Sequence, residues 1–360
     1  MHAILNTLVA SRSRRGILPL IKPLSDNPAH IERLCSLLDL GTFQKTVSRV
    51  QGGFHHCMWR LETNSGCFAV KQLAEDMDMQ DAATIAQINA TEVTAAEFSR
   101  QGIPALYSLD VDRQHLHLID GVGYLVYPWT NARACHRNGI EEHHAVIVAT
   151  TLAHIHRSDI NVPELRDVPA FPVTSERVID LVQLARQRNV RYSDILEDRL
   201  EDLLRIVELH GPALQLLEGQ QVISHGDLDH KNILWDDAGE PLLIDWESAR
   251  RLNPTYELLL EALDWGGITA NFDARPFTTI LRAYVDAGGL IVEDMIPASS
   301  DAIQGAWVSW LLYNVGRAVG LKDNRQRSIG SGQVDLVLSA LLRMEKQADR
   351  LTGIAMQYAS

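Results

Sequence analysis

The stretch HGDLDHKNILW, residues 225–235, places two carboxylates, a lysine and an amide within six residues. Short apolar runs flank these polar residues, VI before them and IL after them. Asp and Asn favour turns because their side chains bond to nearby backbone groups, so a plain turn between two strands is one interpretation. A functional loop is the other, and these residues alone favour neither.

A further polar residue, Asp245, follows the next apolar run in the segment PLLIDW. A carboxylate at a strand end and the amide oxygen of Asn232 in the preceding loop are hard ligands suited to Mg²⁺. That ion takes few protein ligands when substrate phosphates and water complete its coordination shell. Asp227 would then be available to accept a proton from an attacking hydroxyl.

Composition limits the classes of protein to which this chain can belong. The 360 residues are 46% hydrophobic and 22% charged, which is ordinary for a soluble globular protein. A net charge of −13 argues against a nucleic-acid or anionic-membrane partner, because both require a basic surface. No apolar stretch approaches the roughly 20 residues that span a bilayer. Four cysteines far apart, without a CxxC pair, indicate a reducing compartment, and we expect a cytoplasmic protein.

Residues 1–41 are expected to form an arm followed by a helix. Twin arginines in SRSRRGILPLIKP precede an apolar run, but Pro19 interrupts that run, which argues against an export signal. The helix is expected to begin after Asn27, with Pro28 at its first position, and to end at Gly41.

Residues 42–130 carry strand patterns. FQKTVSRV, CMWRLET and CFAVKQ indicate three antiparallel strands separated by Gly-Gly and Asn-Ser-Gly turns. A helical pattern follows over residues 81–101, and the runs HLHLID and GYLVYPW bracket an Asp-Gly turn. Residues 131–360 are mostly helical, apart from the insert that holds the 225–235 stretch. The expected fold class is therefore α+β, with a small antiparallel sheet and a larger helical part.

A lysine in the β-rich half carries a second functional signal. Lys71 lies inside the otherwise apolar strand FAVKQ, where a charge that faces inward needs a partner or a ligand. A lone lysine in a strand is more often at an exposed edge, but this one follows the Gly52-Gly53 turn by one strand. Glycines there would let the backbone approach phosphates. Glu92 in the next helix is the preferred partner of Lys71, and Glu97 is the other candidate.

Together these segments resemble the protein-kinase-like phosphotransferases, specifically the aminoglycoside phosphotransferase and choline kinase group. The resemblance covers about residues 45–320 and is centred on HGDLDHKNILW and LLIDWESA. Asp227 and Asn232 have the spacing of the kinase catalytic loop, in which Asn follows the Asp of H-R-D after four residues. NPTYEL and LAHIHRSD resemble the family forms D-P-x-Y-D-L and L-x-x-L-H. The resemblance implies two lobes, an N-lobe over residues 42–130 and a C-lobe over residues 131–360.

The same resemblance implies the chemistry of the C-lobe loop. Asp227 is the catalytic base, and Asn232 and Asp245 hold Mg²⁺. The core residues match the family, but some neighbours do not, which implies differences in substrate contacts. The departures are His56, Asp229, His230, Asn253 and Glu257.

The resemblance also implies how the N-lobe binds a nucleotide. Lys71 contacts the α- and β-phosphates of ATP, and Glu92 holds Lys71. The adenine bonds to the backbone carbonyl of Tyr127 and the backbone amide of Trp129. The phosphate loop contains Gly52 and Gly53.

The implied reaction is Mg²⁺-dependent transfer of the γ-phosphoryl group of ATP, or of GTP, to a hydroxyl of a small molecule. The acceptors considered are aminoglycoside-like antibiotics, choline or amino alcohols, and sugars; the negative net charge is compatible with a cationic acceptor. A protein kinase, or a nucleotide-binding regulatory module of the same fold, is the alternative. Only eight residues separate Asp245 from Pro254, which favours a small molecule over a protein substrate. The sequence indicates neither the acceptor nor an oligomeric state.

Histidine pairs offer a competing metal site. His115 and His117 face one side of a predicted strand, whereas His154 and His156 are two apart in a predicted helix and do not share a face. Neither pair has a matching third ligand nearby in the sequence, so ordinary surface histidines are the favoured interpretation.

Other polar and aromatic residues of the C-lobe keep two interpretations each. Trp307, Trp310 and Tyr313 form either a cage for a quaternary ammonium group or one packed helical face, and the packed face is favoured. Asp229 and Lys231 either support their loop or contact the acceptor. A set of acidic residues either receives an amine-bearing substrate or lies on a plain helix surface. This acidic set comprises Glu247, Glu257, Glu261 and Asp264.

Overall fold

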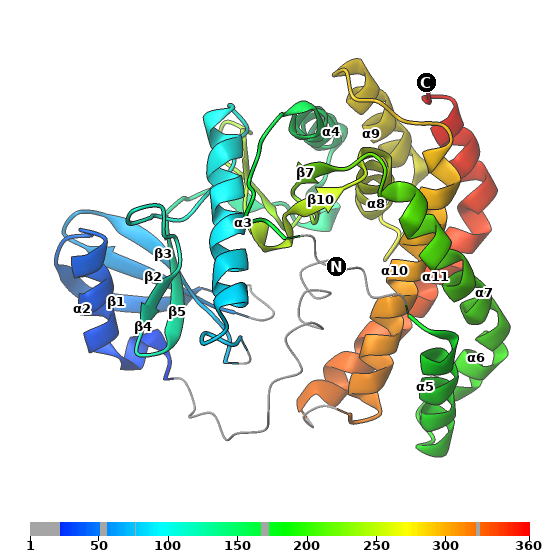
Figure 1. Ribbon diagram of the computed structural model, residues 1–360, viewed down its shortest axis with the longest axis horizontal. Helices are drawn as coiled ribbons and strands as arrows, with labels where there is room; N and C mark the ends of the chain where they lie inside the picture. Colours follow the sequence, from blue (N-terminus) through cyan, green and yellow to red (C-terminus); the bar gives the residue numbers. More distant parts are fainter. Residues whose placement is uncertain (1–21, 51–55, 76, 167–172, 322–324) are drawn as a thin grey trace.

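The computed structural model describes residues 22–50, 56–75, 77–166, 173–321 and 325–360. Within these residues the chain forms two lobes, a β-rich one on the left of Figure 1 and a mostly helical one on the right. This arrangement confirms the predicted α+β fold with a small antiparallel sheet. The Gly52-Gly53 turn lies outside the described residues.

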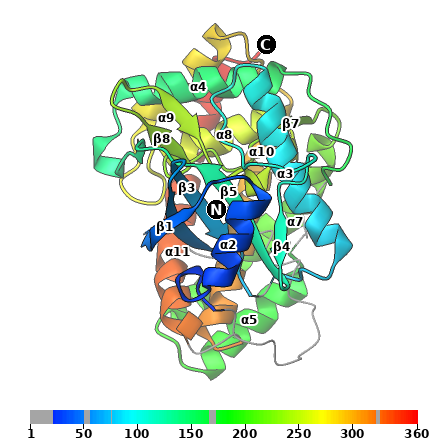
Figure 2. The same cartoon turned by 90° about the vertical axis from the view of Figure 1, so that its left-hand side faces the viewer.

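The small lobe is built on a five-stranded antiparallel sheet with the strand order β1-β2-β3-β5-β4. Alternate residues of a strand face opposite sides, and each side has its own apolar cluster. Helix α2 (Pro28–Leu37) covers one face of the sheet (Figure 2), and helix α3 (Ala82–Arg100) covers the other. Val70 and Val126 belong to the cluster under α2, and Leu125 and Tyr127 belong to the cluster under α3. The strands are β1 (Phe43–Val50), β2 (Cys57–Thr63), β3 (Cys67–Gln72), β4 (His117–Ile119) and β5 (Val122–Pro128).

The predicted N-terminal helix is present as α2 (Pro28–Leu37), preceded by the 3-10 turn η2 (Leu24–Asp26). Asn27 occupies its N-cap position, but the side chain makes no capping hydrogen bond. The helix ends at Leu37, earlier than the expected stop at Gly41. Because its apolar face packs on the sheet, α2 is part of the core of the small lobe.

Local sequence signals determine the ends of the other small-lobe elements. Asp120 and Gly121 both have positive φ, 50° and 81°, as a tight two-residue hairpin between β4 and β5 requires. The long helix is α3 (Ala82–Arg100), and the Asp81 carboxylate accepts two N–H groups of its first turn. Gly102, with a φ of 88°, follows its end. Both boundaries agree with the predicted helix.

A central helix organises the large lobe. α10 (Met295–Ala318) is apolar almost all round, and its neighbours α7, α8 and α11 bury it (Figure 1). The remaining large-lobe helices form around this core. They are α4 (Glu142–Arg157), α5 (Ser175–Gln187), α6 (Ser193–Asp198), α7 (Leu200–Leu217), α8 (Pro254–Trp265), α9 (Ala274–Asp286) and α11 (Arg325–Met356).

Short strands frame the 225–235 stretch. β7 pairs with β10 on one side of it, and β8 pairs with β9 and β6 on the other. A tight turn joins β8 to β9, with a φ of 81° at Gly239. The backbone of Leu243 bonds to Pro104 and Leu106, which fixes the segment after α3 to β9. The elements are β6 (Arg133–Ala134), η3 (Arg137–Gly139), β7 (Val222–Ser224), β8 (Ile233–Trp235), β9 (Pro241–Leu243), η4 (Trp246–Ser248) and β10 (Arg250–Leu252).

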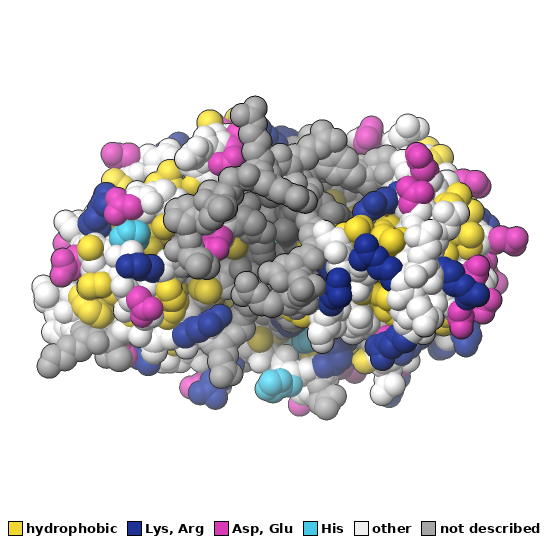
Figure 3. Space-filling model, turned by 90° about the horizontal axis from the view of Figure 1, so that it is seen from below, with side chains coloured by type: hydrophobic (Ala, Val, Ile, Leu, Met, Phe, Trp, Pro, Cys, Tyr) yellow, Lys and Arg dark blue, Asp and Glu magenta, His cyan; other side chains and the backbone are white. Residues whose placement is uncertain are grey.

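Charges of both signs are mixed on the surface. Seen from below, Lys and Arg side chains gather over the helical half among Asp and Glu side chains (Figure 3). The net charge of −13 therefore does not produce a uniformly acidic face here. Among the described helices, none is long and apolar enough to cross a membrane.

Candidate active site

The loop between β7 and β8 is fixed from within by His225. This buried imidazole donates from Nε2 to the carbonyl of Ile244 at 3.0 Å and accepts at Nδ1 from the N–H of Asp227 at 3.3 Å. An amide N–H can only donate, so the tautomer follows from these contacts. Burial lowers the pKa of His225, which keeps the ring neutral and suited to one donated and one accepted bond.

Glycine is required at the next position. Gly226 has a φ of 79°, and a Cβ built on it would lie 2.4 Å from the carbonyl oxygen of Ser248. A side chain would therefore meet both backbone strain and a backbone atom that cannot move aside easily. The Gly for Arg exchange in the H-R-D pattern thus has a direct steric reason in this chain.

Two buried carboxylates of α8 hold the loop on either side of Asp227. Glu257 accepts from the N–H of Gly226 at 2.7 Å, and Glu261 accepts from the N–H of Leu228 at 2.9 Å. They lie one helical turn apart and therefore share a face of α8. Neither a plain helix surface nor an amine-receiving site describes them, and both expectations are wrong for this pair.

These two carboxylates differ in charge. Burial alone would raise the pKa of Glu257, but the bond to His156 at 2.8 Å and the charge of that ring lower it. Burial raises the pKa of Glu261 well above its ordinary value, and the nearby charges of Asp227 and Glu257 raise it further. These pKa directions favour an ionised Glu257 and a protonated Glu261 as the two supports of the loop.

The loop brings the predicted base next to the predicted metal ligands. The side-chain amide of Asn232 donates to the backbone carbonyl of Asp227 at 2.8 Å, which turns its oxygen away from that contact. The N–H of Ile244 donates to the carbonyl of Asn232 at 2.9 Å, so Asp245, which follows just after the end of β9, lies near Asn232. Asp245 has a φ of 63° and a ψ of 59°, a left-handed conformation that costs non-glycine residues about 1 kcal/mol.

Lys71 reaches across from β3 to this loop. It is buried, so the edge-exposed interpretation is wrong, and its Nζ lies 2.7 Å from Asp245 and 2.9 Å from Glu247. Burial alone would lower the pKa of Lys71, but the charges of Asp245 and Glu247 outweigh burial and raise it. The lysine is therefore charged, and it joins the small lobe to the segment that carries Asp245, the predicted metal ligand.

Glu92 does not hold Lys71 in this structure. Its carboxylate accepts from the hydroxyl of Tyr127 at 2.6 Å and from the N–H of Ser108 at 2.8 Å, so it joins α3 to β5. The other candidate, Glu97, pairs with Arg100 on its own helix. The expected Lys71 partner is therefore corrected: Glu247, a residue placed in the acidic set by sequence, fills that role beside Asp245.

The backbone atoms expected to bind adenine are used by the sheet. The N–H of Trp129 donates to the carbonyl of Cys67 on β3 at 3.2 Å. In an antiparallel ladder, residues that exchange backbone hydrogen bonds with the partner strand recur at every second position. Trp129 bonds to β3, so Tyr127, two residues earlier and paired with Ala69, also bonds to β3. The expectation that the Tyr127 carbonyl and Trp129 amide face the nucleotide is therefore wrong for this structure.

Asp229 and Lys231 support their own loop. Asp229 accepts from the N–H of Lys231 at 2.8 Å, and the two side chains form an ion pair. Burial and the charges of Asp227 and Asp264 raise the pKa of Asp229. Asp264 in turn pairs with Arg137 at 3.2 Å, so this member of the acidic set already has a cation.

Three of the four paired histidines, His115, His117 and His156, bond within the protein, and the fourth, His154, is exposed on α4. His115 and His117 are buried rather than on the surface, and each bonds to a backbone carbonyl, of Ser108 and Leu109 respectively. His156 pairs with Glu257, as described above. Across the described part of the chain, no three His, Cys, Asp or Glu side chains converge as a metal site.

The late-helix aromatic residues lie in the core, as favoured. Trp307 and Trp310 are buried, and Trp310 stacks on Tyr313 with ring centroids 5.2 Å apart. The guanidinium of Arg317 lies over the Tyr313 ring, 5.4 Å from its centroid. The outer aromatic face therefore already carries a cation from this chain.

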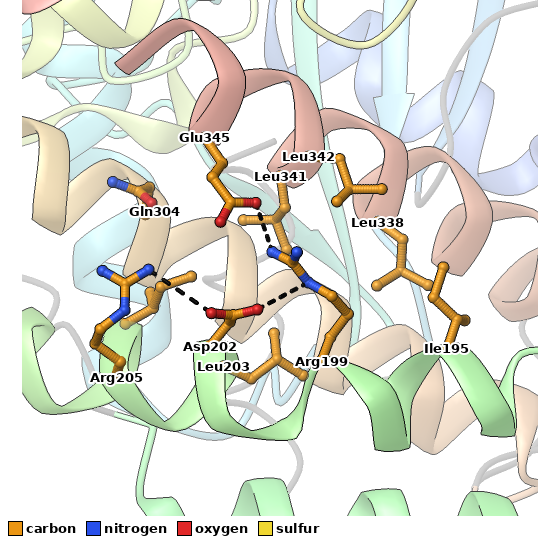
Figure 4. Close-up of a pocket in the computed structure, with 11 residues that line it drawn as sticks. Ile195, Arg199, Asp202, Leu203, Arg205, Gln304, Leu338, Leu341, Leu342 and Glu345 are labelled. Atoms are coloured by element: carbon orange, nitrogen blue, oxygen red, sulfur yellow. Dashed lines mark hydrogen bonds and ion pairs between the residues drawn. The ribbon is translucent and has the colours of Figure 1, made fainter. Parts of the chain in front are cut away.

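A surface hollow lies in the large lobe, between α6, α7, α10 and α11. Arg199 crosses it to pair with Asp202 and Glu345, and Arg205 approaches Asp202 from the other side (Figure 4). None of the predicted site residues lines it, so its ion pairs join helices and do not extend the site around Asp227.

Known proteins place these features in a wider group. The sequence model of the phosphotransferase enzyme family (APH) matches residues 46–294. No curated protein sequence matches the chain. Among solved structures, spectinomycin phosphotransferase in complex with ADP and spectinomycin is 14% identical, with a TM-score of 0.61, over 91% of this chain and 98% of that one.

Two further solved structures have the same fold. Choline kinase LicA from Streptococcus pneumoniae is 16% identical, with a TM-score of 0.56, over 88% of this chain and 99% of that one. Ethanolamine kinase from Plasmodium vivax is 12% identical, with a TM-score of 0.58, over 91% of this chain and 95% of that one. At these identities the likeness establishes the fold, which is that of the aminoglycoside and choline kinases.

Proposed function

This chain belongs to the phosphotransferase enzyme family, and from that premise we propose that it transfers the γ-phosphoryl group of ATP to a hydroxyl of a small molecule, with Mg²⁺. The observation that carries the proposal is the placement of Asp227. The N–H groups of its two neighbours, Gly226 and Leu228, both bond to carboxyl groups of α8, and the side-chain amide of Asn232 bonds to the backbone carbonyl of Asp227. A carboxylate held this rigidly beside two hard oxygen ligands suits in-line phosphoryl transfer, which depends on positioning and charge more than on covalent chemistry.

Asp227 is proposed as the group that orients the acceptor hydroxyl and takes its proton. The proton moves to the carboxylate late, as the hydroxyl oxygen bonds to phosphorus. The loop bonds from α8 keep the backbone of Asp227 in place during that step. Lys71 offsets negative charge on the nucleotide phosphates from the opposite lobe.

The donor set of Asn232 and Asp245 fits Mg²⁺. Asn232 uses its amide nitrogen for Asp227, which leaves a neutral oxygen, and Asp245 contributes a carboxylate that is 34% exposed. Two hard oxygen donors are few, but Mg²⁺ keeps water and takes phosphate oxygens. When bound, the ion neutralises charge on the β- and γ-phosphates.

The proposed adenine contacts lie one residue further along the chain than the expected ones. The carbonyl of Val126 accepts from the N–H of Leu109 at 2.6 Å, on the edge of β5 that faces away from β3. By alternation, the carbonyl of Pro128 faces that same edge, followed by the N–H of Thr130. These two groups replace Tyr127 and Trp129 as the proposed partners of the adenine ring, and ATP or GTP remains a matter for assay.

The acceptor is proposed to be a small amine-bearing alcohol, such as an aminoglycoside-like antibiotic, an amino alcohol or an amino sugar. The solved relatives described above are named for spectinomycin, choline and ethanolamine. A protein acceptor is disfavoured because η4 and β10 take up six of the eight residues between Asp245 and Pro254. The four cysteines are free thiols, in keeping with the expected cytoplasmic location.

The test is phosphate transfer from radiolabelled ATP to a panel of aminoglycosides, amino alcohols, sugars and casein. We expect transfer to one small-molecule class. Asp227→Asn should then lose transfer by about 10³-fold or more while it still binds nucleotide. Asp237→Asn, in the exposed β8–β9 turn, is the matched control and should transfer normally. Near wild-type turnover by Asp227→Asn would refute the assignment, and phosphorylation of casein alone would favour a protein kinase.

A further inference from the structure

Glu247 connects the two lobes at the phosphate end of the site. It lies on η4, two residues after Asp245, and its Oε2 is 2.9 Å from Lys71 Nζ and 3.2 Å from His56 Nε2. Lys71 and His56 both come from the small lobe, whereas Glu247 belongs to the large lobe. The side chains of Lys71 and His56 are only 10% and 8% exposed, so these contacts are poorly screened by water.

His56 is oriented so that it must donate to Glu247. Its Nδ1 accepts from the backbone N–H of Ala74 at 3.0 Å, and an amide N–H can only donate. The ring proton is therefore on Nε2, the atom that faces Glu247. Glu247 thus receives a hydrogen bond from the end of β2 in addition to the charge of Lys71.

The other carboxylates near Lys71 are committed elsewhere. Asp245, its second partner, is the proposed metal ligand, and a carboxylate shared with a divalent cation neutralises a lysine less completely. Glu92 is bonded to Tyr127 and Ser108. Glu247, by contrast, bonds to Lys71 itself and to His56 beside it.

We propose that Glu247 is the positioning residue of Lys71 and that, together with His56, it clamps the small lobe to the large lobe around the nucleotide phosphates. This goes beyond the proposed function, which assigns no role to Glu247 or His56, and rests on it only in taking the ligand to be a nucleotide. In this arrangement the phosphate-binding lysine is held from the large lobe, and α3 serves a separate purpose in supporting β5.

The inference and simple charge removal predict opposite effects of Glu247→Gln on nucleotide affinity. Glu247→Gln takes a negative charge away from the phosphate site, which by itself would tighten nucleotide binding. If Glu247 positions Lys71, its loss should instead weaken binding while Lys71 is present. In a Lys71→Met background nothing remains to be positioned, so Glu247→Gln should leave the affinity unchanged or improve it.

The experiment is a double-mutant cycle on Lys71 and Glu247, read as the affinity for a fluorescent ADP analogue in EDTA and again in Mg²⁺. We expect Glu247→Gln alone to weaken binding about tenfold in both conditions, with a coupling to Lys71→Met of about the same size. Glu92→Gln is the matched control, because it removes a buried carboxylate of the sequence-predicted pair. It should lower the unfolding temperature and be additive with Lys71→Met.

Several results would overturn the clamp. These are additive effects of Glu247→Gln and Lys71→Met, a weakening seen only with Mg²⁺, which would make Glu247 a metal ligand, or coupling of Lys71 to Glu92. His56→Asn provides a second route if Glu247→Gln fails to fold. His56→Asn should weaken the binding of the ADP analogue about threefold and show coupling to Lys71→Met. Additive effects of the two substitutions would again count against the clamp. If the wild-type protein binds no nucleotide, the proposed function fails together with this inference; wild-type binding with an additive cycle refutes the clamp alone.

Discussion

The two carboxylates beneath the catalytic loop should respond oppositely to the same substitution. Glu257 and Glu261 each accept a backbone N–H beside Asp227, but the first is ionised and the second is neutral. Replacement by glutamine changes a carboxylate into an amide of the same shape. It therefore removes a charge from Glu257 and almost nothing from Glu261.

The size of the difference follows from the contacts. Glu257→Gln weakens charge-assisted bonds to Gly226 and His156 inside the protein, which should cost about 2–3 kcal/mol of unfolding free energy. Glu261→Gln exchanges one neutral acceptor for another and keeps the bond to the N–H of Leu228, so we expect a cost of about 0.5 kcal/mol or less.

Urea unfolding followed by tryptophan fluorescence measures both costs on equal terms. Turnover should follow the same order, with kcat reduced about tenfold in Glu257→Gln because the backbone around Asp227 is held less firmly. The KM for ATP should change little, since neither residue contacts Lys71 or β5. Equal losses in the two variants, or the larger loss in Glu261→Gln, would refute the assignment of charges.

Three further substitutions test separate parts of the structure. Gly226→Ala should abolish transfer and cost more than about 2 kcal/mol, because its Cβ would meet the Ser248 carbonyl; a folded, active variant by circular dichroism and phosphate assay would contradict this. Tyr127→Phe removes the hydroxyl that Glu92 accepts and should cost about 1 kcal/mol in thermal unfolding, with no change expected if that bond is absent. Burial lowers the pKa of His210, so the unfolded chain takes up its proton first and stability should fall as pH drops below about 6.5. His210→Phe should lose that part of the acid sensitivity in melts between pH 5 and 8, and an unchanged pH profile would exclude it.

The sequence indicated that the residues of the charged loop lie together, because their spacing is local; their catalytic and metal-binding roles stay predictions. Asp227 and Asn232 lie in one short segment, and Asp245 follows a single hairpin, so spacing along the chain translates into spacing in the fold. Lys71 was also identifiable, since a charge inside an apolar strand needs an explanation at once. The Asp-Gly turn depends on two adjacent residues and was equally predictable.

The errors concern partners that the sequence does not place. Glu92 has the right distance along the chain to meet Lys71, but whether its carboxylate turns to the lysine or to Tyr127 depends on side-chain packing between α3 and β5. The expected adenine contacts were misassigned because GYLVYPW is apolar on both faces, so its pattern does not indicate which backbone groups bond to β3.

Glu257 and Glu261 illustrate a different limit. A glutamate in a helix is on the surface far more often than in the core, so the favoured interpretation for any one of them is exposure. Their burial becomes visible only when the catalytic loop is seen to need two acceptors at neighbouring N–H groups. The N–H groups that need acceptors lie in the 225–235 stretch, whereas the glutamates that accept from them lie in α8.

The short connection from Asp245 to α8 has a consequence for control of the enzyme. Its residues are taken up by η4 and by β10, which is paired to β7 at the root of the catalytic loop. Protein kinases carry at this point a longer segment whose phosphorylation turns the enzyme on. A chain without room for such a segment would be constitutively competent, and its output would follow how much protein is made and how much acceptor arrives.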